Sequence, residues 1–169
     1  IVQLCQEYHE KGKRCLVFGH YSPMLSYGPD VCVSGQIVHW EKIYEDILAK
    51  VYAGAYNSTN LANVDYWWML REGAVELGCD FGQPINPKFI RELNSTFVND
   101  PLLGKISVYE LVLTRLKQMS EDTVVFDPFT GPIYDNQGNL RIKAGERATH
   151  DQLWTIDWFV DNIIASVPK

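Results

Sequence analysis

The sequence predicts an α/β protein, in which short buried strands alternate with amphipathic helices. Apolar residues recur at helical spacing in residues 1–12. The run "RCLVFGH" over 14–20 is short and apolar and contains a glycine near its end, which is typical of a buried strand. Helical spacing returns over 41–54 and stops at Gly54. A helix, a strand and a second helix in this order favour a layered α/β arrangement.

The first third of the chain supplies these elements in order. The helix over 1–12 ends at Gly12, and the strand over 14–20 follows it. Residues 21–30 are expected to form a loop because two prolines and a glycine interrupt them. Residues 31–40 have the apolar character of a second extended or mixed segment. The helix over 41–54 then has one apolar face, made of Ile43, Tyr44, Ile47, Leu48 and Val51.

The middle of the chain contains the stretch "DYWWMLREGAVELG", residues 65–78. We expect a helix-like run after the two tryptophans and a short strand over 73–78. The next element is a helix over 86–100, with Asn86 as its N-cap and Pro87 at its first position.

The last third is expected to form two more helices, a strand and a hairpin. Ser107 stands three residues before Glu110, which is the spacing of a capping box at a helix start. The sequence "DNQGN" lies between two runs of alternating polarity, which indicates a hairpin turn. The expected elements are a helix over 107–120, a strand over 123–129, a hairpin over 131–146 and a helix over 151–167.

Composition limits the classes of function. The 169 residues suffice for one domain or two small lobes, and 46% of them are hydrophobic, as in a globular chain. A net charge of −6 argues against a nucleic-acid partner, which needs a basic face. No run of about 18 apolar residues is present to predict a membrane span. The chain starts without methionine, so we expect a fragment of a longer protein.

The cysteines do not predict a metal site. Cys5, Cys15, Cys32 and Cys79 lack the close pair spacing of a zinc or redox motif. They are compatible with two disulfides and equally with buried free thiols, so they do not indicate a compartment.

No catalytic constellation is recognisable. The four histidines are scattered, and the zinc-protease, nucleophile-elbow, phosphate-loop and dinucleotide-binding motifs are all missing from the sequence. Asp122, Asp127 and Asp135 surround one expected strand end, but their spacing fits no metal loop and favours solvated or capping carboxylates. We therefore expect no enzyme activity, no metal and no cofactor. A cysteine–histidine nucleophile stays open as an alternative, because such residues meet only in space.

Two places are candidates for ligand contacts. His20, Tyr21 and Ser22 follow a strand directly, and ligands of open α/β sheets bind beyond the carboxyl ends of strands. The alternative is that these residues only close the strand. Trp67 and Trp68 are either stacking plates for a flat ligand or core anchors.

Four pieces of the sequence, in the same order, match one known family. They are "CLVFGHYSPMLSYGPD", "VSGQIVHWEKIY", "DYWWMLREGAVELG" and "FDPFTGPIYDNQGNLRI". The chain resembles the C-terminal half of the basic membrane protein family of substrate-binding lipoproteins. These are nucleoside- or purine-binding partners of bacterial ABC transporters and are similar to type I periplasmic binding proteins.

The resemblance implies a two-lobe fold of three-layer α/β lobes, which are joined by crossing strands and close on a ligand. Residues 1–40 would be the end of the second lobe and the hinge crossing. Residues 41–125 would return into the first lobe with a helical insertion, and 126–169 would add a further crossing, the hairpin and a C-terminal helix. The first half would be missing, so the expected partners are that N-terminal half or a second copy, and an ABC transporter permease. The implied location is extracytoplasmic, in the periplasm or as a cell-surface lipoprotein.

The resemblance also implies site residues in the first loop. His20 and Tyr21 fall at cleft-facing positions, and Ser22 matches the family's serine or asparagine. Pro23 replaces the usual aspartate and cannot accept a hydrogen bond from ribose. Asp30 would compensate for this loss only if the loop bends back.

The remaining implied site residues lie around the tryptophan pair and the lobe crossing. Trp67 takes the family's tryptophan position, whereas Trp68 takes a variable one. Arg71 replaces a lysine and keeps its charge, and His39 lies near the crossing. The implied function is binding of a nucleoside or nucleobase in an inter-lobe cleft. The alternatives are a nucleoside-processing enzyme on the same scaffold and a non-binding structural or interaction fragment.

Overall fold

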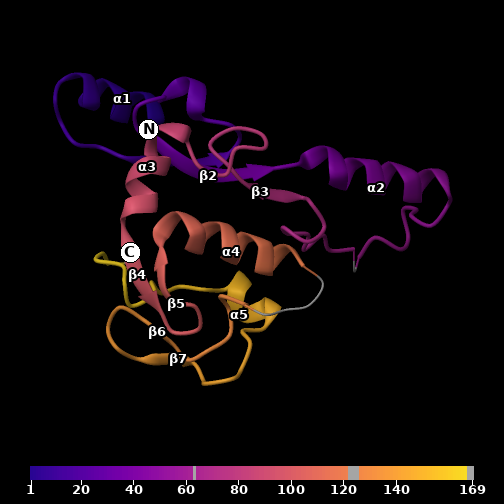
Figure 1. Ribbon diagram of the computed structural model, residues 1–169. Helices are drawn as coiled ribbons and strands as arrows, with labels where there is room; N and C mark the ends of the chain where they lie inside the picture. Colours follow the sequence, from indigo (N-terminus) through magenta and orange to yellow (C-terminus); the bar gives the residue numbers. More distant parts are fainter. Residues whose placement is uncertain (63, 122–125, 167–169) are drawn as a thin grey trace. The chain divides into compact units, whose positions relative to one another are not determined.

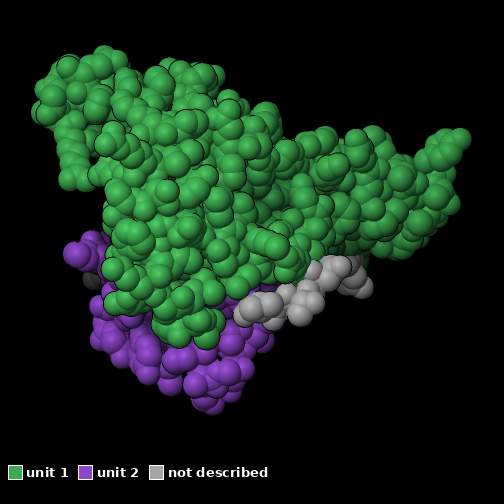
Figure 2. Space-filling view, viewed as in Figure 1, with its two compact units in different colours: residues 1–124 green, residues 125–169 purple. Residues whose placement is uncertain are grey.

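The computed structural model describes residues 1–62, 64–121 and 126–166 and is a mixture of helices and short strands (Figure 1). It confirms the α/β class. The chain forms two compact units, residues 1–124 and residues 125–169 (Figure 2). Within the described ranges, no helix is both long enough and apolar enough to cross a lipid bilayer.

A three-stranded sheet forms the centre of the first unit. Its strands are β1 (Val17–Tyr21), β2 (Cys32–Val38) and β3 (Val75–Leu77), in the order β1-β2-β3. β2 runs parallel to β1 and antiparallel to β3. These strands confirm the predictions of extended segments within 14–20, 31–40 and 73–78. β2 carries much of the core, because Cys32, Ser34, Gly35 and Ile37 are all buried.

Helix α1 (Val2–Glu10) contacts β1 and the short 3₁₀ helix η1 (Leu25–Tyr27). A disulfide between Cys5 and Cys15 fastens this helix to the segment that enters β1. Cys32 and Cys79 are buried free thiols, so the chain combines both states that the sequence left open. A side chain at Gly28 would lie 2.7 Å from Val2, which shows how closely the helix approaches the loop.

Helix α2 (Trp40–Tyr52) confirms the helix predicted over 41–54, but its apolar face is largely uncovered. Tyr44, Leu48 and Val51 are 58%, 68% and 53% exposed. The amphipathic pattern therefore predicts the helix correctly. It does not show whether the apolar face is buried, and within the described residues most of that face is exposed.

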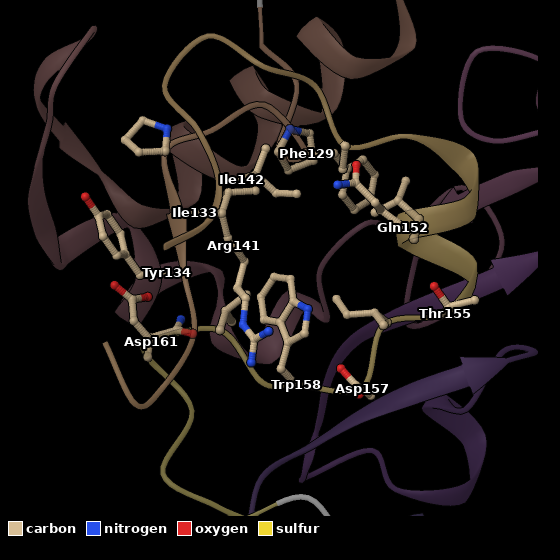
Figure 3. Close-up of a pocket in the computed structure, with 17 residues that line it drawn as sticks. Phe129, Ile133, Tyr134, Arg141, Ile142, Gln152, Thr155, Asp157, Trp158 and Asp161 are labelled. Carbon is tan, nitrogen blue, oxygen red and sulfur yellow. The ribbon is translucent and has the colours of Figure 1, made fainter. Parts of the chain in front are cut away.

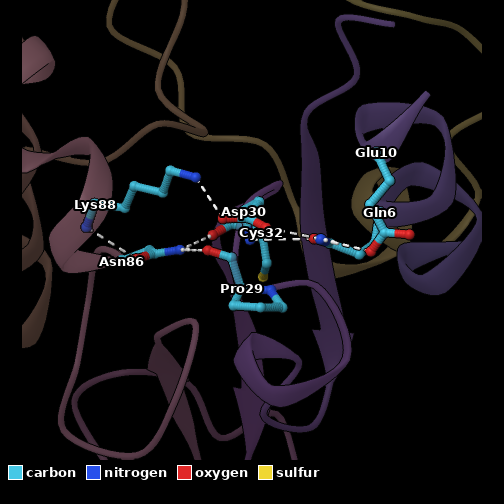
Figure 4. A network of polar contacts seen from close by, with 7 residues as sticks. All are labelled: Gln6, Glu10, Pro29, Asp30, Cys32, Asn86 and Lys88. Carbon is cyan, nitrogen blue, oxygen red and sulfur yellow. Dashed lines mark hydrogen bonds and ion pairs between the residues drawn. The ribbon is translucent and has the colours of Figure 1, made fainter. Parts of the chain in front are cut away.

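Helix α3 (Pro87–Ser95) begins as predicted, with the Asn86 side chain accepting a hydrogen bond from the Lys88 backbone. Asn86 is only 3% exposed, and its amide nitrogen donates to the carbonyls of Pro29 (2.9 Å) and Cys32 (2.8 Å) (Figure 4). The two amide bonds attach the start of α3 to the segment where β2 begins. Lys88 also pairs with Asp30 (Figure 4).

The prediction that this helix extends to residue 100 was wrong. After Ser95 the chain forms β4 (Phe97–Asp100), which pairs antiparallel with β5 (Gly104–Ser107). The Asp100 side chain accepts hydrogen bonds from two backbone groups of the intervening turn, and Gly104 has a positive φ of 70°. The hairpin partner satisfies the backbone groups that a longer helix would have used.

Helix α4 (Val108–Ser120) confirms the helix predicted over 107–120. The hydroxyl of Ser107 accepts a hydrogen bond from the Glu110 backbone N–H at 3.2 Å and donates one to the Glu110 carboxylate at 2.9 Å. The serine and glutamate spacing thus marked the helix start correctly.

The second unit contains β6 (Ile133–Tyr134) and β7 (Leu140–Ile142), which form the predicted hairpin. Asp135 in its turn is 1% exposed. The carboxylate of Asp135 accepts hydrogen bonds from the backbone groups of Gln137 and Asn139, the Asn139 amide and the Arg141 guanidinium. A solvated or capping role for this aspartate is therefore corrected to that of a buried organiser of the turn.

Two predicted helical stretches are wrong. Helix α5 covers only His150–Trp154 and does not continue to residue 167, because the backbone of Val160 pairs with Asp135 of the hairpin instead. The run after the tryptophans is also not helical. Residues 64–69 have no regular structure and 70–73 form a turn, in which the Glu72 carboxylate accepts from the Met69 backbone at 2.8 Å.

The strand predicted over 123–129 lies partly outside the described residues, as does Asp122. Its described part, 126–129, is not a strand. Here Asp127 accepts a hydrogen bond from the Phe129 backbone and pairs with Arg147.

Candidate ligand-binding surface

The parallel pair β1 and β2 brings two strand ends to one edge of the sheet. His20 and Tyr21 at the end of β1 are paired in register with Gln36 and Ile37 of β2. β2 ends at Val38, and α2 starts at Trp40. The sheet edge that ligands of open α/β sheets use is therefore bordered by the end of β1 and the first turn of α2.

Four aromatic side chains lie in succession along this edge. We call them the aromatic row: His20, Tyr21, Trp40 and Tyr44. The rings of His20 and Tyr21 stack with centroids 3.8 Å apart, Tyr21 meets Trp40 edge-on at 6.3 Å, and Trp40 stacks with Tyr44 at 6.5 Å. Tyr21, Trp40 and Tyr44 are 55%, 48% and 58% exposed. An exposed series of flat rings can bind the face of another flat ring.

Tyr21 has an unusual backbone conformation. Its φ is +68°, in the left-handed region that bulky residues rarely adopt. Such a residue costs on the order of 1–3 kcal/mol and is found preferentially at functional sites. The left-handed turn ends β1 and presents the Tyr21 ring beside Trp40. This strain favours a functional role over simple closure of the strand.

His39, between β2 and α2, is held by two carboxylates. Its Nδ1 lies 2.8 Å from Glu41 and its Nε2 lies 2.7 Å from Glu76 of β3. Carboxylates only accept, so both ring nitrogens must carry protons for both bonds to form. Glu76, and then Glu41, raise the pKa of the His39 imidazole. We call this group the His39 clamp.

The His39 clamp joins three elements of the first unit. The second oxygen of Glu76 accepts a hydrogen bond from the backbone of Gly82 at 2.6 Å. The clamp borders a hollow of about 310 Å³ whose other walls are mostly apolar, including Val75, Leu77 and Leu116. Both imidazole nitrogens are used within the protein. The predicted ligand contact of His39 stays a prediction, and this geometry fits a residue that positions α2 beside β3.

The His39 clamp should make stability depend on pH. Because the pKa of His39 is raised on folding, its contribution is complete below the unfolded value of about 6.5 and is lost as pH rises through the higher folded pKa. In the native chain the melting temperature should rise as the pH is lowered from the alkaline side towards about 6.5, and we expect His39→Gln to remove this rise. Thermal unfolding across this range measures it.

The matched control for this prediction is His20→Gln. It removes another histidine, for which no carboxylate partner is seen among the described residues. If the melting temperature of His39→Gln depended on pH in the same way as that of the native chain, the stabilising role of the His39 clamp would be contradicted.

The other predicted contacts lie on different elements. Trp67, which is 38% exposed, belongs to the connector 64–69, and Arg71 is exposed in the turn that precedes β3. Trp68 is half-buried, with its ring 5.1 Å from that of Tyr66, which fits packing. Ligand binding by Trp67 and Arg71 stays a prediction.

Asp30, in the loop after β1, has partners within the protein. The Asp30 carboxylate accepts hydrogen bonds from Lys88 and from Gln6, and these contacts hold the pKa of Asp30 below its usual value. Asp30 thus anchors α3 and α1, and a ligand contact by Asp30 stays a prediction. Ser22 is exposed beside Tyr21.

Sequence reasoning missed Trp40 and Tyr44. Their signal was available, because Trp40 follows the apolar run 31–38 in the same way as His20 and Tyr21 follow theirs. Trp40 and Tyr44 are also four residues apart, which places them on one side of a helix. Only the parallel pairing of β1 with β2 reveals that both sets share one edge.

No protein-family model matches the chain. The chain is similar to a purine-binding protein. This relative, from Brucella abortus (strain 2308), is 26% identical over 161 residues, which are 95% of this chain. The match covers 37% of the relative, so the chain spans little more than a third of its length. The relative's name is that of a binding protein and not of an enzyme.

Proposed function

We propose that the chain is part of a solute-binding protein for a purine or nucleoside, with the aromatic row as its stacking surface. The observation that carries this proposal is the row itself, at the carboxyl end of two parallel strands and next to a strained tyrosine. The similarity to a purine-binding protein supports the ligand class.

The chemistry of the row suits a flat heterocycle. A base stacked on an aromatic side chain gains roughly 1–3 kcal/mol, and the rings of the row are exposed enough to receive one. Stacking alone does not distinguish bases, so a few polar groups must fix orientation. His20, which belongs to the row, and Ser22, which follows Tyr21, are our candidates for this role. In the family that the chain resembles, an aspartate is usual at the position of Pro23. The proline implies that ribose is bound here in a different mode.

The larger assembly is also part of this proposal. A row on an open surface needs a second wall to enclose a ligand, and a two-lobe fold would supply it from the remainder of a longer protein or from a second copy. Delivery to an ABC transporter permease in an extracytoplasmic compartment would follow. The Cys5–Cys15 disulfide supports an oxidising compartment.

Substitutions in the row test the proposed function. We expect Tyr21→Ala and Trp40→Ala each to weaken purine or nucleoside binding about 10- to 100-fold, the equivalent of one lost stacking contact. Isothermal titration calorimetry with adenosine, guanosine, adenine and uridine measures this, using the complete native polypeptide that contains the chain.

The matched control is Tyr52→Ala. Tyr52 lies on the same helix, is 97% exposed and is outside the row. Binding should stay within about twofold of the native value in this variant. Failure of every purine and nucleoside to bind would refute the ligand class. Equal losses of affinity in Tyr21→Ala, Trp40→Ala and Tyr52→Ala would refute the aromatic row as the binding surface.

A further inference from the structure

The second unit contains a cavity of about 640 Å³ (Figure 3). The hairpin β6–β7, helix α5 and the segment 156–162 line it. This volume falls within the range of small-molecule sites, roughly 300–1,000 Å³. Protein interiors are close-packed, and an unfilled cavity costs free energy in proportion to its volume. The hollow is open to solvent on one side, so a small molecule can enter it.

The wall of the cavity is mainly apolar. Side chains of both hairpin strands meet those of α5 and the segment after it: Phe129, Ile133, Ile142, Leu153 and Ile156. Such a wall removes the hydrocarbon or aromatic part of a ligand from water, which is the usual source of affinity in a small-molecule site.

Hydrogen-bond donors are present at one place in this wall. The Arg141 guanidinium lies over the Trp158 ring, with its carbon 5.7 Å from the ring centroid (Figure 3). The Asp135 carboxylate accepts a hydrogen bond from the Nε–H of Arg141 at 2.8 Å, which fixes the orientation of the guanidinium. Within the described chain, the terminal Arg141 amino groups and the Trp158 indole N–H make no hydrogen bond. These donors can bind a carboxylate or a carbonyl group.

Acceptors line the same cavity. Asp157 and Asp161 are both exposed lining residues, and no hydrogen bond to either carboxylate is found in the described ranges. A ligand with only a negative charge would be repelled by these two groups, whereas a ligand with only a positive charge would leave the Arg141 donors unused. The combination suits a molecule that carries both charges.

We propose that this cavity binds a small zwitterion with an apolar body, such as an apolar amino acid. Arg141 and Trp158 bind its carboxylate, Asp157 or Asp161 binds its ammonium group, and the apolar wall holds the side chain. This site lies wholly within the second unit and is separate from the aromatic row. It adds a second ligand class to that of the proposed function.

Three probes with the same ring separate the charge requirements: L-phenylalanine, phenylacetate and phenethylamine. We expect L-phenylalanine to bind at least about 10-fold more tightly than either singly charged probe, because each charge contributes a charge-assisted contact. Saturation-transfer NMR and calorimetry on the complete chain measure these affinities. No binding of L-phenylalanine, or tighter binding of phenethylamine, would overturn the proposal.

Substitutions locate the site. Arg141→Met should weaken L-phenylalanine binding about 10-fold, whereas Arg147→Met, on the same unit but outside the cavity wall, should leave it unchanged. Asp157→Asn combined with Asp161→Asn removes no contact within the described protein, so folding should persist. It should weaken L-phenylalanine binding and strengthen phenylacetate binding. Unchanged affinities in the double variant would overturn the proposal.

Two variants distinguish this site from the aromatic row of the proposed function. Trp40→Ala should leave L-phenylalanine binding unchanged, and Arg141→Met should leave nucleoside binding unchanged. The competing occupant is a polypeptide segment of a longer or second chain. A structure of the complete protein in which such a segment fills the cavity would overturn the ligand assignment.

Discussion

Asp135→Ala is expected to unfold the hairpin of the second unit. The carboxylate is buried and accepts hydrogen bonds from two backbone groups, the Asn139 amide and the Arg141 guanidinium. Alanine removes the acceptor that all of these donors share, so the turn loses the hydrogen bonds that organise it. Hydrogen-exchange protection of the amides in β6 and β7 should fall about 100-fold or more. Every tenfold fall in protection corresponds to about 1.4 kcal/mol of lost stability.

The same carboxylate predicts acid sensitivity. The Asn139 side chain and then its backbone N–H and Arg141 hold the pKa of Asp135 far below its usual value. Because the folded pKa is the lower one, the stability that it supplies is present above the unfolded value of about 3.9 and is lost as pH falls further. Asp151→Ala, at an exposed aspartate of the same unit, is the control. Equal protection in both variants would contradict the role of Asp135.

Asn86→Ala is expected to lower the free energy of unfolding of the first unit by about 2–4 kcal/mol. Loss of an N-cap side chain costs about 1 kcal/mol. The buried carbonyl of Cys32 also loses its donor, at about 1–3 kcal/mol when no substitute is found, whereas water can replace the donor to the carbonyl of the exposed Pro29. Urea denaturation followed by circular dichroism measures the difference.

Two further variants make the Asn86 experiment specific. Asn86→Asp keeps the cap acceptor and loses both amide donors, so it should recover only the cap contribution. Asn99→Ala, at an exposed position of β4, should change stability by less than about 0.5 kcal/mol. If Asn86→Asp were as stable as the native chain, the bonds to Pro29 and Cys32 would not be the cause.

The Asn86 bonds bear on the proposed ligand surface as well as on stability. They attach α3 to the start of β2. This strand pairs with β1, which carries Tyr21, and leads into α2, which carries Trp40, so it fixes the relative position of the two rings. A loosened β2 would change the relative position of the two rings. We therefore expect binding at the aromatic row to weaken together with stability in Asn86→Ala, whereas Tyr21→Ala should weaken binding with little loss of stability.

The uncovered face of α2 extends the aromatic row along the first unit. Leu48 and Val51 are more than half exposed on the helix that carries Trp40 and Tyr44. Exposed apolar residues in succession are typical of a surface that another element covers. In the proposed two-lobe protein, the remainder of that protein or a second copy would cover this helix and enclose the ligand.

Local signals in the sequence correctly predicted several elements. Asn86 with Pro87, and Ser107 with Glu110, marked the starts of α3 and α4, because capping depends on residues within one turn of the chain. The turn "DNQGN" marked the β6–β7 hairpin for the same reason. The strand before His20 and Tyr21 was equally visible, so half of the aromatic row was predicted.

Two of the errors, in the lengths of helices, share one physical cause. The helix expected over 86–100 stops at Ser95 because β4 finds a partner in β5, and the helix expected over 151–167 stops at Trp154 because Val160 pairs with the hairpin. The first pairing lies within a tight hairpin and the second joins residues far apart in sequence, and the hydrogen bonds of both outweigh local helix propensity. A helical pattern cannot reveal such a competitor.

The sequence by itself determined the α/β class, the main helix starts, the hairpin turn and the aromatic residues at the end of β1. Only the tertiary structure decided that Trp40 and Tyr44 join His20 and Tyr21, since that depends on the parallel register of β1 and β2. It also decided that His39 faces two carboxylates and that Asp135 is buried. Side-chain partners far apart in the chain are chosen by packing and backbone pairing, which no local pattern records.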